Sequence, residues 1–259
     1  MPRVFSSSTL ALSAAFAGLL LAGGATVAEA QRGFRGGNCS FQGSSGGPNI
    51  EYDGRFIMVR MWYDWHDGWC YDYPDMERNF VLILKEITVI RPHMNRSNVL
   101  RFDDTEIFKF PMVYVSEPGF WQPSAEDLRG MRDYMLKGGL VFFDDFMRQE
   151  WYNFEVHFKR AFPDAIFYRL ENTHPIFDSF YRIQNLAIPY PNSGGGNLTA
   201  EFYAVYKDND PNRPMMAIIS YNSDLGDYME WSGTGRNPIN LANEAYKFAV
   251  NFVIYGMTR

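Results

Sequence analysis

The sequence predicts an α/β protein: a three-layer, flavodoxin-like sandwich whose mainly parallel sheet lies between two layers of helices. Short apolar segments rich in β-branched and aromatic residues alternate along the chain with segments of helical periodicity. The helical segments are about 12 to 16 residues long, which suits the crossovers that join parallel strands. Strands joined in this way form a sheet that helices cover on both faces.

The first 30 residues have the layout of a secretory signal. Arg3 precedes an apolar run over residues 10–22, and a small-x-small cleavage site lies at 28–30. We therefore expect residues 1–30 to be a signal peptide and the mature chain to begin at Gln31, in the periplasm or outside the cell. Retention of the signal as a membrane anchor is the alternative. No later segment is apolar for the roughly 18 residues that a membrane-spanning helix needs.

A leader rich in glycine and serine over residues 31–50 precedes a single predicted domain over residues 51–259. The chain has two cysteines, Cys39 in the leader and Cys70 near the start of the domain. Because both would reach an oxidising compartment, we expect a disulfide between them. Two unpaired thiols are the alternative.

The first half of the domain begins with a strand and a helix. Residues 55–62 form a β-rich apolar run, and residues 73–88 have helical spacing after Pro74. Two short apolar segments, at 99–102 and 110–115, are predicted strands.

A second helix is predicted to begin after Ser124. Ser124 and Asp127 have the spacing of a capping box, and the helix ends at the glycine pair 138–139. Residues 183–210 interrupt the alternation and are predicted to form an insertion or a hairpin over one edge of the sheet. The remaining predicted elements are strands at 140–143, 165–170 and 214–220, and helices at 150–161 and 239–255.

Charge and motifs exclude several classes of protein. Signal removal deletes one base and one acid, so the mature chain keeps the net charge of −6, which is unfavourable for binding nucleic acid. No predicted strand is followed by a Gly-x-Ser-x-Gly elbow, a Walker loop or a Gly-x-Gly-x-x-Gly turn, and no predicted helix contains His-Glu-x-x-His. Serine hydrolases, nucleotide-binding proteins and zinc proteases of the usual kinds are therefore excluded, and we expect no cofactor.

Polar side chains follow six successive predicted strands, and ligands of open parallel sheets bind beyond the carboxyl ends of the strands. Asp144 and Asp145 come directly after strand 140–143, where one carboxylate is expected to point toward the cleft. His174 lies in a rigid Thr-His-Pro turn. With Glu117, these are the candidate catalytic residues, and capping of helices and turns is their alternative role. The candidate ligand-binding residues at the strand ends are Ser116, Asp104, Asn222 and Asp224.

A resemblance to a known family rests on three segments: RFDDTEIFKFPMVYVSEPGFWQPSAEDLRGMRDYMLKGGLVFFDDF, HPIF and SYNSDLGDYMEW. Together they resemble the bacterial domain of unknown function family 4159, over roughly residues 55–255. That family is similar in fold to class I glutamine amidotransferases and to the trehalose-utilisation (ThuA-like) proteins. The resemblance implies a class I glutamine amidotransferase-like sandwich.

The resemblance also implies that the usual amidotransferase chemistry is absent. In an amidotransferase, the strand that corresponds to 140–143 ends in a cysteine nucleophile on a tight elbow. Here Asp144 and Asp145 follow the strand, and neither cysteine is near them in the sequence. The chain thus resembles a degenerate or repurposed amidotransferase without a glutaminase nucleophile.

Three functions remain open at this stage. We favour a noncatalytic module whose acidic, aromatic-rimmed cleft binds a small molecule, a glycan or a protein, because a fold alone does not transfer an activity. A carboxylate-dependent hydrolase, with glycans among its substrates, would use Asp144 or Asp145 with His174 or Glu117. A metal-assisted enzyme would use Asp144, Asp145 and His174 as ligands. The relative positions of these side chains discriminate between the three.

Overall fold

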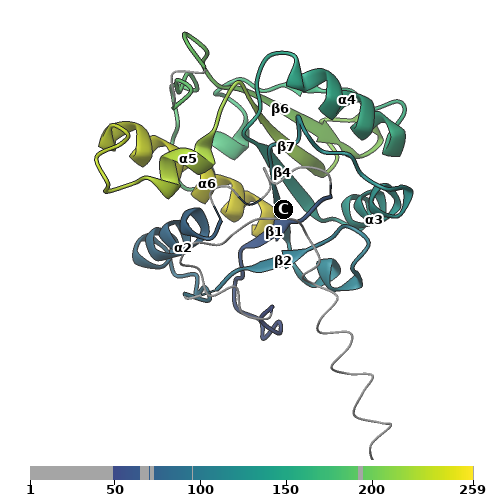
Figure 1. The fold of residues 1–259 in the computed structure, drawn as a ribbon, viewed down its shortest axis with the longest axis horizontal. Helices are drawn as coiled ribbons and strands as arrows, with labels where there is room; N and C mark the ends of the chain where they lie inside the picture. Colours follow the sequence, from purple (N-terminus) through teal and green to yellow (C-terminus); the bar gives the residue numbers. More distant parts are fainter. Residues whose placement is uncertain (1–48, 65–69, 71–72, 95, 192–194, 259) are drawn as a thin grey trace, which may run out of the picture. The chain divides into compact units, whose positions relative to one another are not determined.

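A seven-stranded sheet forms the centre of the fold (Figure 1). In chain order its strands are β1 (Val59–Met61), β2 (Asn98–Leu100), β3 (Met112–Ser116), β4 (Leu140–Asp144), β5 (Tyr168–Arg169), β6 (Glu201–Tyr206) and β7 (Met215–Tyr221). They lie in the order β2-β1-β3-β4-β7-β6-β5, and the pairs from β2 to β7 are parallel. Only β6 runs antiparallel to both of its neighbours in the described sheet. The predicted α/β class with a mainly parallel sheet is confirmed.

The computed structural model describes residues 49–64, 70, 73–94, 96–191 and 195–258. All of them belong to one unit, Gly37–Arg259. The predicted signal peptide and nearly all of the predicted leader lie outside the described residues. Among the helices that are described, none combines the length and the apolar character needed to cross a membrane.

Helices cover both faces of the sheet (Figure 1). One layer consists of α2 (Asp75–Ile87), α5 (Leu225–Glu230) and α6 (Ile239–Thr258). The other consists of α3 (Ala125–Leu136) and α4 (Glu150–Ala161). Three short 3-10 helices complete the described elements: η2 (Thr105–Lys109), η3 (Pro175–Asp178) and η4 (Lys207–Asn209).

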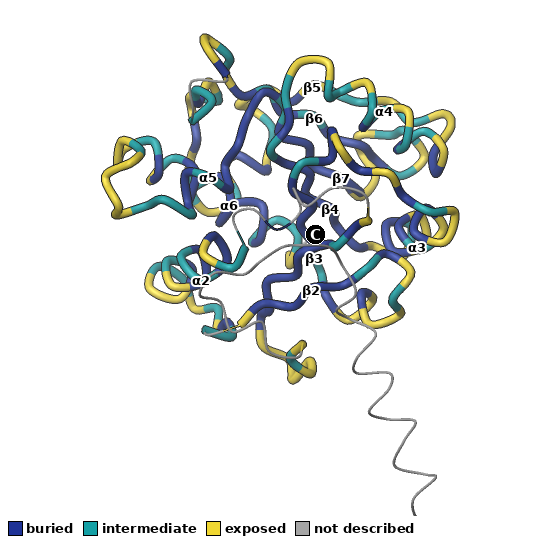
Figure 2. Tube along the Cα trace, in the orientation of Figure 1, coloured by how far each residue is buried: buried dark blue, intermediate teal, exposed yellow. Residues whose placement is uncertain are grey.

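Two hydrophobic cores lie between the sheet and these layers, because successive strand residues point to opposite faces. Phe142 packs its ring 5.0 Å from that of Phe252 on α6, whereas Phe143 packs 5.0 Å from Phe154 on α4. Figure 2 shows the central strands as buried segments and the exposed positions on the outer helices and loops. The sheet is therefore buried on both faces, and polar side chains gather at its ends.

The start of α3 follows the sequence closely. Ser124 and Asp127 form the predicted capping box, with each side chain accepting a hydrogen bond from the other residue's backbone. Within the helix, a side chain at Gly130 would place its Cβ 1.8 Å from the carbonyl oxygen of Phe102. The glycine thus allows α3 to lie directly against the segment that leaves β2.

Two elements depart from the sequence expectation. A short hairpin does begin the segment 183–210, where Pro189 and Thr199 form an antiparallel bridge. The same segment, however, also contributes β6, which lies inside the sheet between β7 and β5. The six-residue helix α5 was also not predicted, and it follows β7 directly after a short turn.

Candidate functional site

Three neighbouring strands, β3, β4 and β7, end at one edge of the sheet, which we call the carboxyl edge. The residue after each strand has a left-handed backbone: φ is 47° at Glu117, 64° at Asp145 and 52° at Asn222. Residues other than glycine pay about 1–3 kcal/mol for such sparsely populated conformations, which cluster at functional sites. Of the six described non-glycine residues with positive φ, these three and Arg148 lie at this edge or in the loop after β4. The carboxyl edge is therefore the candidate site.

Asp144, the last residue of β4, holds the start of α5. Its side chain is fully buried. Its Oδ2 accepts hydrogen bonds from the backbone N–H groups of Leu225 at 2.9 Å and Gly226 at 3.0 Å, and from the Tyr114 hydroxyl at 3.3 Å. Of the two adjacent acids, Asp144 is thus the one that supports the scaffold.

Asp145 is the acid that stands at the elbow between β4 and α4. It is partly exposed, and its Oδ1 accepts a hydrogen bond from the Tyr190 hydroxyl at 3.0 Å. Tyr190 belongs to the hairpin closed by the Pro189–Thr199 bridge. Burial, and next the charge of Asp145, raise the pKa of the Tyr190 hydroxyl far above its ordinary value. The raised pKa favours the protonated hydroxyl, which is the form that donates to Asp145.

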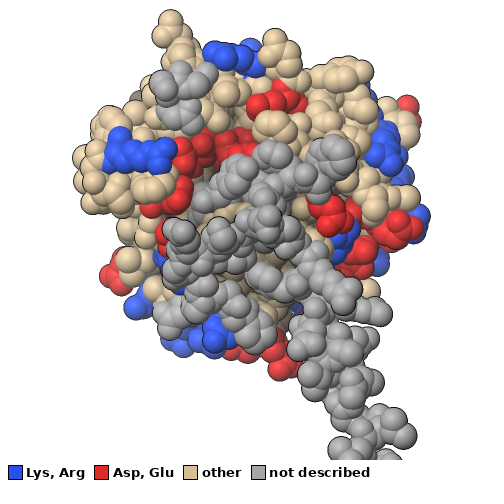
Figure 3. Space-filling model, viewed as in Figure 1, with Lys and Arg blue, Asp and Glu red and all other residues tan. Residues whose placement is uncertain are grey.

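Asp224 lies beside these acids and caps α5. Its Oδ1 accepts from the backbone N–H of Asp227 at 2.7 Å, and the residue is only 5% exposed. Burial, followed by the charges of Asp145, Asp227 and Asp144, raises the pKa of Asp224 well above 3.8. The site thus combines an acid whose pKa is raised, Asp224, with a second acid, Asp145, at the neighbouring elbow. Figure 3 shows acidic atoms gathered beside α5 on this face.

Asn222 connects three strands at the same edge. Its Oδ1 accepts from the backbone N–H of Arg148 at 3.1 Å, and its Nδ2 donates to Glu201 Oε1 at 3.3 Å. Glu201 begins β6 and lies opposite Tyr221 in the sheet. Asn222 is therefore buried and hydrogen-bonded through both atoms of its amide, and it positions Glu201 at the rim of the site.

Ser116 and Glu117 form the β3 part of the edge. The Tyr63 hydroxyl donates to both of their carbonyl oxygens at 3.0 Å, and the Glu117 backbone N–H donates to the carbonyl oxygen of Asp144 at 3.1 Å. The side chain of Ser116 is buried, whereas Glu117 is partly exposed. The turn after β3 is thus held on both sides, by Tyr63 from the segment after β1 and by β4.

A family model matches residues 55–257, which is most of the chain, and it describes a Domain of unknown function (DUF4159). The chain belongs to this family. No curated protein matches it. Membership in DUF4159 confirms the family that the sequence resembled, and the matched range includes every acid of the carboxyl edge.

Two of the predicted site residues of this DUF4159 domain, Asp104 and His174, lie away from the carboxyl edge. Asp104 is the N-cap of η2 and accepts from the backbone N–H of Glu106 at 2.9 Å. It follows the edge strand β2, and two strands, β1 and β3, separate β2 from β4. The structure does not bring Asp104 to the acids of the carboxyl edge.

His174 is the second of these. Its Nδ1 accepts from the backbone N–H of Ile176 at 3.2 Å, and its Nε2 lies 2.9 Å from the Tyr206 hydroxyl. Tyr206 ends β6 and pairs with Met215 at the start of β7, the opposite end from Asn222. Burial lowers the pKa of the His174 ring. The expectation that His174 would converge with Asp144 and Asp145 is wrong, because the chain folds back across the sheet after β5.

The predicted metal site of Asp144, Asp145 and His174 lacks its nitrogen ligand, because His174 lies at the opposite end of the sheet. Within the described ranges, no group of three His, Cys, Asp or Glu side chains could hold a metal ion. Cys70 is buried and disulfide-bonded. Its predicted partner, Cys39, lies outside the described residues.

A buried ion pair behind Asp144 was missed by the sequence reasoning. Arg60 Nε donates to Glu77 Oε1 at 2.5 Å, and the two side chains are 0% and 2% exposed. The Arg60 guanidinium lies 4.9 Å from the ring centroid of Tyr114, whose hydroxyl donates to Asp144. The sequence did offer one signal for this pair, since Arg60 is a charged residue within the apolar run that forms β1. The network joins α2, β1, β3 and β4 and ends at the candidate site.

Proposed function

We propose that this chain is an exported, noncatalytic binding module whose carboxyl edge holds a ligand rich in hydrogen-bond donors. The left-handed residues after β3, β4 and β7 are the observation that supports the proposal. They place polar side chains from three adjacent strands at one edge, in conformations that packing alone does not favour. The signal-like sequence over residues 1–30 supports export.

The chemistry of the edge favours hydroxyl or ammonium groups over anions. Asp145 presents an oxygen acceptor at its rim and Asp224 lies behind it, whereas Glu201 at the same rim is paired with Arg169 at 3.3 Å. A neutral glycan or an amino sugar offers many donors to such acceptors, whereas an anionic ligand would be repelled by the local negative charge. The ligand class that fits best is therefore a neutral or cationic polyhydroxyl compound.

The strand order supports the finer assignment of the fold. Counted along the chain, the parallel strands β1, β2, β3, β4 and β7 lie in the order second, first, third, fourth, fifth. Flavodoxin-like folds have this order and bind ligands at the carboxyl ends of their strands. The left-handed Asp145 between β4 and α4 occupies the place of a nucleophile elbow. An amidotransferase-like domain whose nucleophile has been replaced by an acid would explain why Asp145 stands at this turn.

A ligand screen with matched variants tests the proposal. The exported protein is screened by thermal shift against neutral oligosaccharides, amino sugars and polyamines, with anionic oligosaccharides as the comparison set. A ligand present at a hundredfold excess over Kd stabilises the folded chain by about 2.7 kcal/mol. Asp145→Asn keeps the size and the left-handed tolerance of the residue and removes its charge, so the shift should disappear.

Asp208→Asn is the control, because Asp208 is also an acid at positive φ (57°) but lies in η4, between β6 and the start of β7. It should bind as the parent does. The proposal fails if no compound of the donor-rich set shifts the melting temperature, or if Asp145→Asn responds as strongly as the parent.

A second function is favoured by one observation, the raised pKa of Asp224 beside Asp145. A protonated and an ionised carboxyl group in one site can act as general acid and base in glycoside hydrolysis. Release of nitrophenol from nitrophenyl glycosides, lost in both Asp224→Asn and Asp145→Asn, would favour this hydrolase over the binding module.

A further inference from the structure

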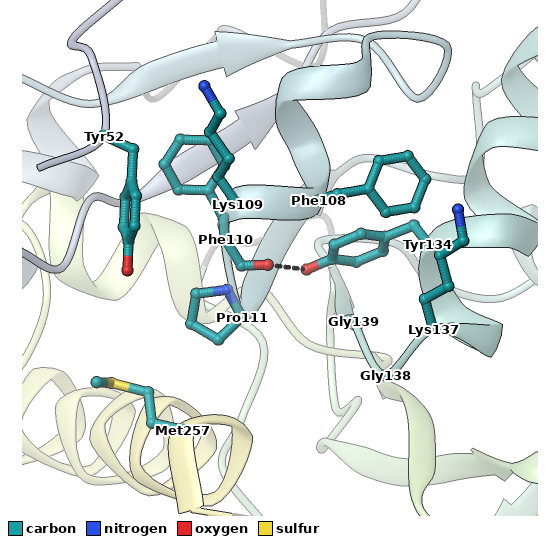
Figure 4. Close-up of a pocket in the computed structure, with 10 residues that line it drawn as sticks. All are labelled: Tyr52, Phe108, Lys109, Phe110, Pro111, Tyr134, Lys137, Gly138, Gly139 and Met257. Atoms are coloured by element: carbon teal, nitrogen blue, oxygen red, sulfur yellow. Dashed lines mark hydrogen bonds between the residues drawn. The ribbon is translucent and has the colours of Figure 1, made fainter. Parts of the chain in front are cut away.

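A pocket of about 340 Å³ lies at the opposite, amino-terminal edge of β3 and β4. Its volume is within the range of small-molecule sites, which begins near 300 Å³. Figure 4 shows that it is formed by the end of η2 and the residues that lead into β3, by the end of α3 and the turn after it, by Met257 of α6 and by Tyr52. No acid of the carboxyl edge contributes to it, so it is a separate candidate site.

The floor of this amino-edge pocket is rigid. The Tyr134 hydroxyl donates to the carbonyl oxygen of Phe110 at 3.0 Å, which is the dashed line in Figure 4. The Tyr134 ring lies so close to Gly139 that a Cβ there would be 2.2 Å from its Cζ. The hydroxyl end of the ring is thus held by a hydrogen bond and by the close approach of Gly139, which gives the pocket a fixed aromatic surface.

Exposed apolar side chains surround this floor. Tyr52, Phe108 and Met257 are 39%, 41% and 45% exposed, and all three line the pocket. Tyr52 lies on one side of the opening, across from Phe108 and Tyr134 (Figure 4). Large apolar surfaces gathered around one cavity are typical of a site that receives an apolar body.

The charge of the pocket is positive, although the chain has a net charge of −6. Its lining includes two lysines and no acid. Lys109 is paired with Glu106 at 2.6 Å. Lys137 has its Nζ 4.3 Å from the ring centroid of Phe108 and forms no ion pair within the described part of the chain. An ammonium beside an aromatic surface is therefore available to an anion.

We propose that the amino-edge pocket binds a small aromatic carboxylate. The ring of the ligand packs against the Phe108 and Tyr134 rings, on the side of the pocket where Lys137 lies, and its carboxylate pairs with Lys137. Since the pocket and the carboxyl edge lie at opposite ends of the strands and carry opposite charge, this site is independent of the proposed function.

Three probes that share one ring system test the proposal: 2-naphthoate, 2-naphthylmethanol and 2-naphthylmethylamine. Calorimetric titration of the full exported chain should give the lowest Kd for the naphthoate, about three- to fivefold below that of the alcohol, as expected for one partly exposed ion pair. The amine should bind most weakly. Lys137→Gln should remove the preference for the carboxylate, and Phe108→Ala should weaken binding of all three probes.

Two controls make the result specific. Lys85→Gln removes a lysine on α2 that is 54% exposed and should leave the preference unchanged. Asp145→Asn should also leave it unchanged, which separates failure here from failure of the proposed function. Equal affinity for the three probes, no binding of naphthoate, or an equal loss in Lys85→Gln would overturn the proposal.

Discussion

The chain enters the central parallel strands at the amino edge and leaves them at the carboxyl edge, and the turns at the two edges are built from different residues. At the carboxyl edge, charged or amide residues such as Asp145 and Asn222 adopt left-handed conformations. At the amino edge, the left-handed position before β4 is Gly138 (φ 103°), which adopts it without steric cost. The acids of the first edge are bonded into the scaffold, whereas Lys137 at the second stands on the surface. The comparison teaches that the polar groups of the carboxyl edge also stabilise the fold, whereas the charged group of the amino edge does not.

The largest expected effect is at Asp144. Asp144→Ala would remove the carboxylate oxygen that accepts from the Leu225 and Gly226 N–H groups and from the Tyr114 hydroxyl. Because a stranded buried donor costs about 1–3 kcal/mol, the free energy of unfolding should fall by about 3 kcal/mol or more, measured by urea denaturation. The control, Asp133→Ala on the exposed side of α3, should change it by less than about 0.5 kcal/mol. A loss of stability at Asp144 as small as that of the control would show that this acid does not stabilise the fold, contrary to the comparison.

The next effect concerns pH and Asp224. Because its folded pKa lies above 3.8, the folded chain binds this proton more tightly than the unfolded chain does. The resulting stability is fully present below about pH 3.8 and is lost as the pH rises through the folded pKa. Asp224→Asn stays neutral and remains a good N-cap. Relative to the parent, it should therefore be more stable at pH 8 than at pH 4.

Each tenfold difference in proton affinity between the folded and unfolded chains corresponds to about 1.4 kcal/mol. Urea denaturation of both proteins at pH 4, 6 and 8 measures the difference. A stability difference that stays constant with pH would show that Asp224 keeps an ordinary proton affinity.

A smaller effect is expected at Tyr190. Tyr190→Phe removes the hydroxyl that donates to Asp145 and keeps the ring. A hydrogen bond to a charged group at a partly buried position contributes about 1.5 kcal/mol, and the melting temperature should fall accordingly. Tyr152→Phe, at a position 73% exposed, provides the control. If both variants melt alike, the hairpin does not hold Asp145.

The smallest effect on stability is predicted for Lys137. Lys137→Gln breaks no ion pair in the described part of the chain, so the free energy of unfolding should change by less than about 0.5 kcal/mol. The same variant should lose the preference for naphthoate. A large loss of stability would show that Lys137 stabilises the fold, as the acids of the carboxyl edge do, and would contradict the comparison between the two edges.

The long elements could be predicted from the sequence because local signals and packing agree there. The apolar run at 140–143 became β4, and the helix predicted at 150–161 is α4. β6 was missed because it lies in a segment flanked by glycine, proline and polar residues, and only its pairing with β7 identifies it. At six residues, α5 is too short to show a helical period.

The candidate site was predictable to the extent that it follows strands directly. Asp144, Asp145, Asn222 and Asp224 come within a few residues of β4 or β7, so strand direction fixed their edge. The sequence could not assign their roles, since the contact between Asp144 and α5 joins residues about 80 positions apart. His174 was misplaced because the direction of the chain after the short strand β5 depends on tertiary packing against Tyr206 and Tyr255.

The bond between Asp144 and α5 has a consequence for hydrogen exchange. The first N–H groups of a helix normally have no internal acceptor and exchange with solvent rapidly, and a helix of six residues has little stability of its own. At the start of α5, the Leu225 and Gly226 amides instead donate to a buried carboxylate that belongs to the sheet. Their deuterium uptake should therefore follow the opening of β4 rather than the fraying of a helix end. Two amides at the surface layer thus become reporters of the stability of the core.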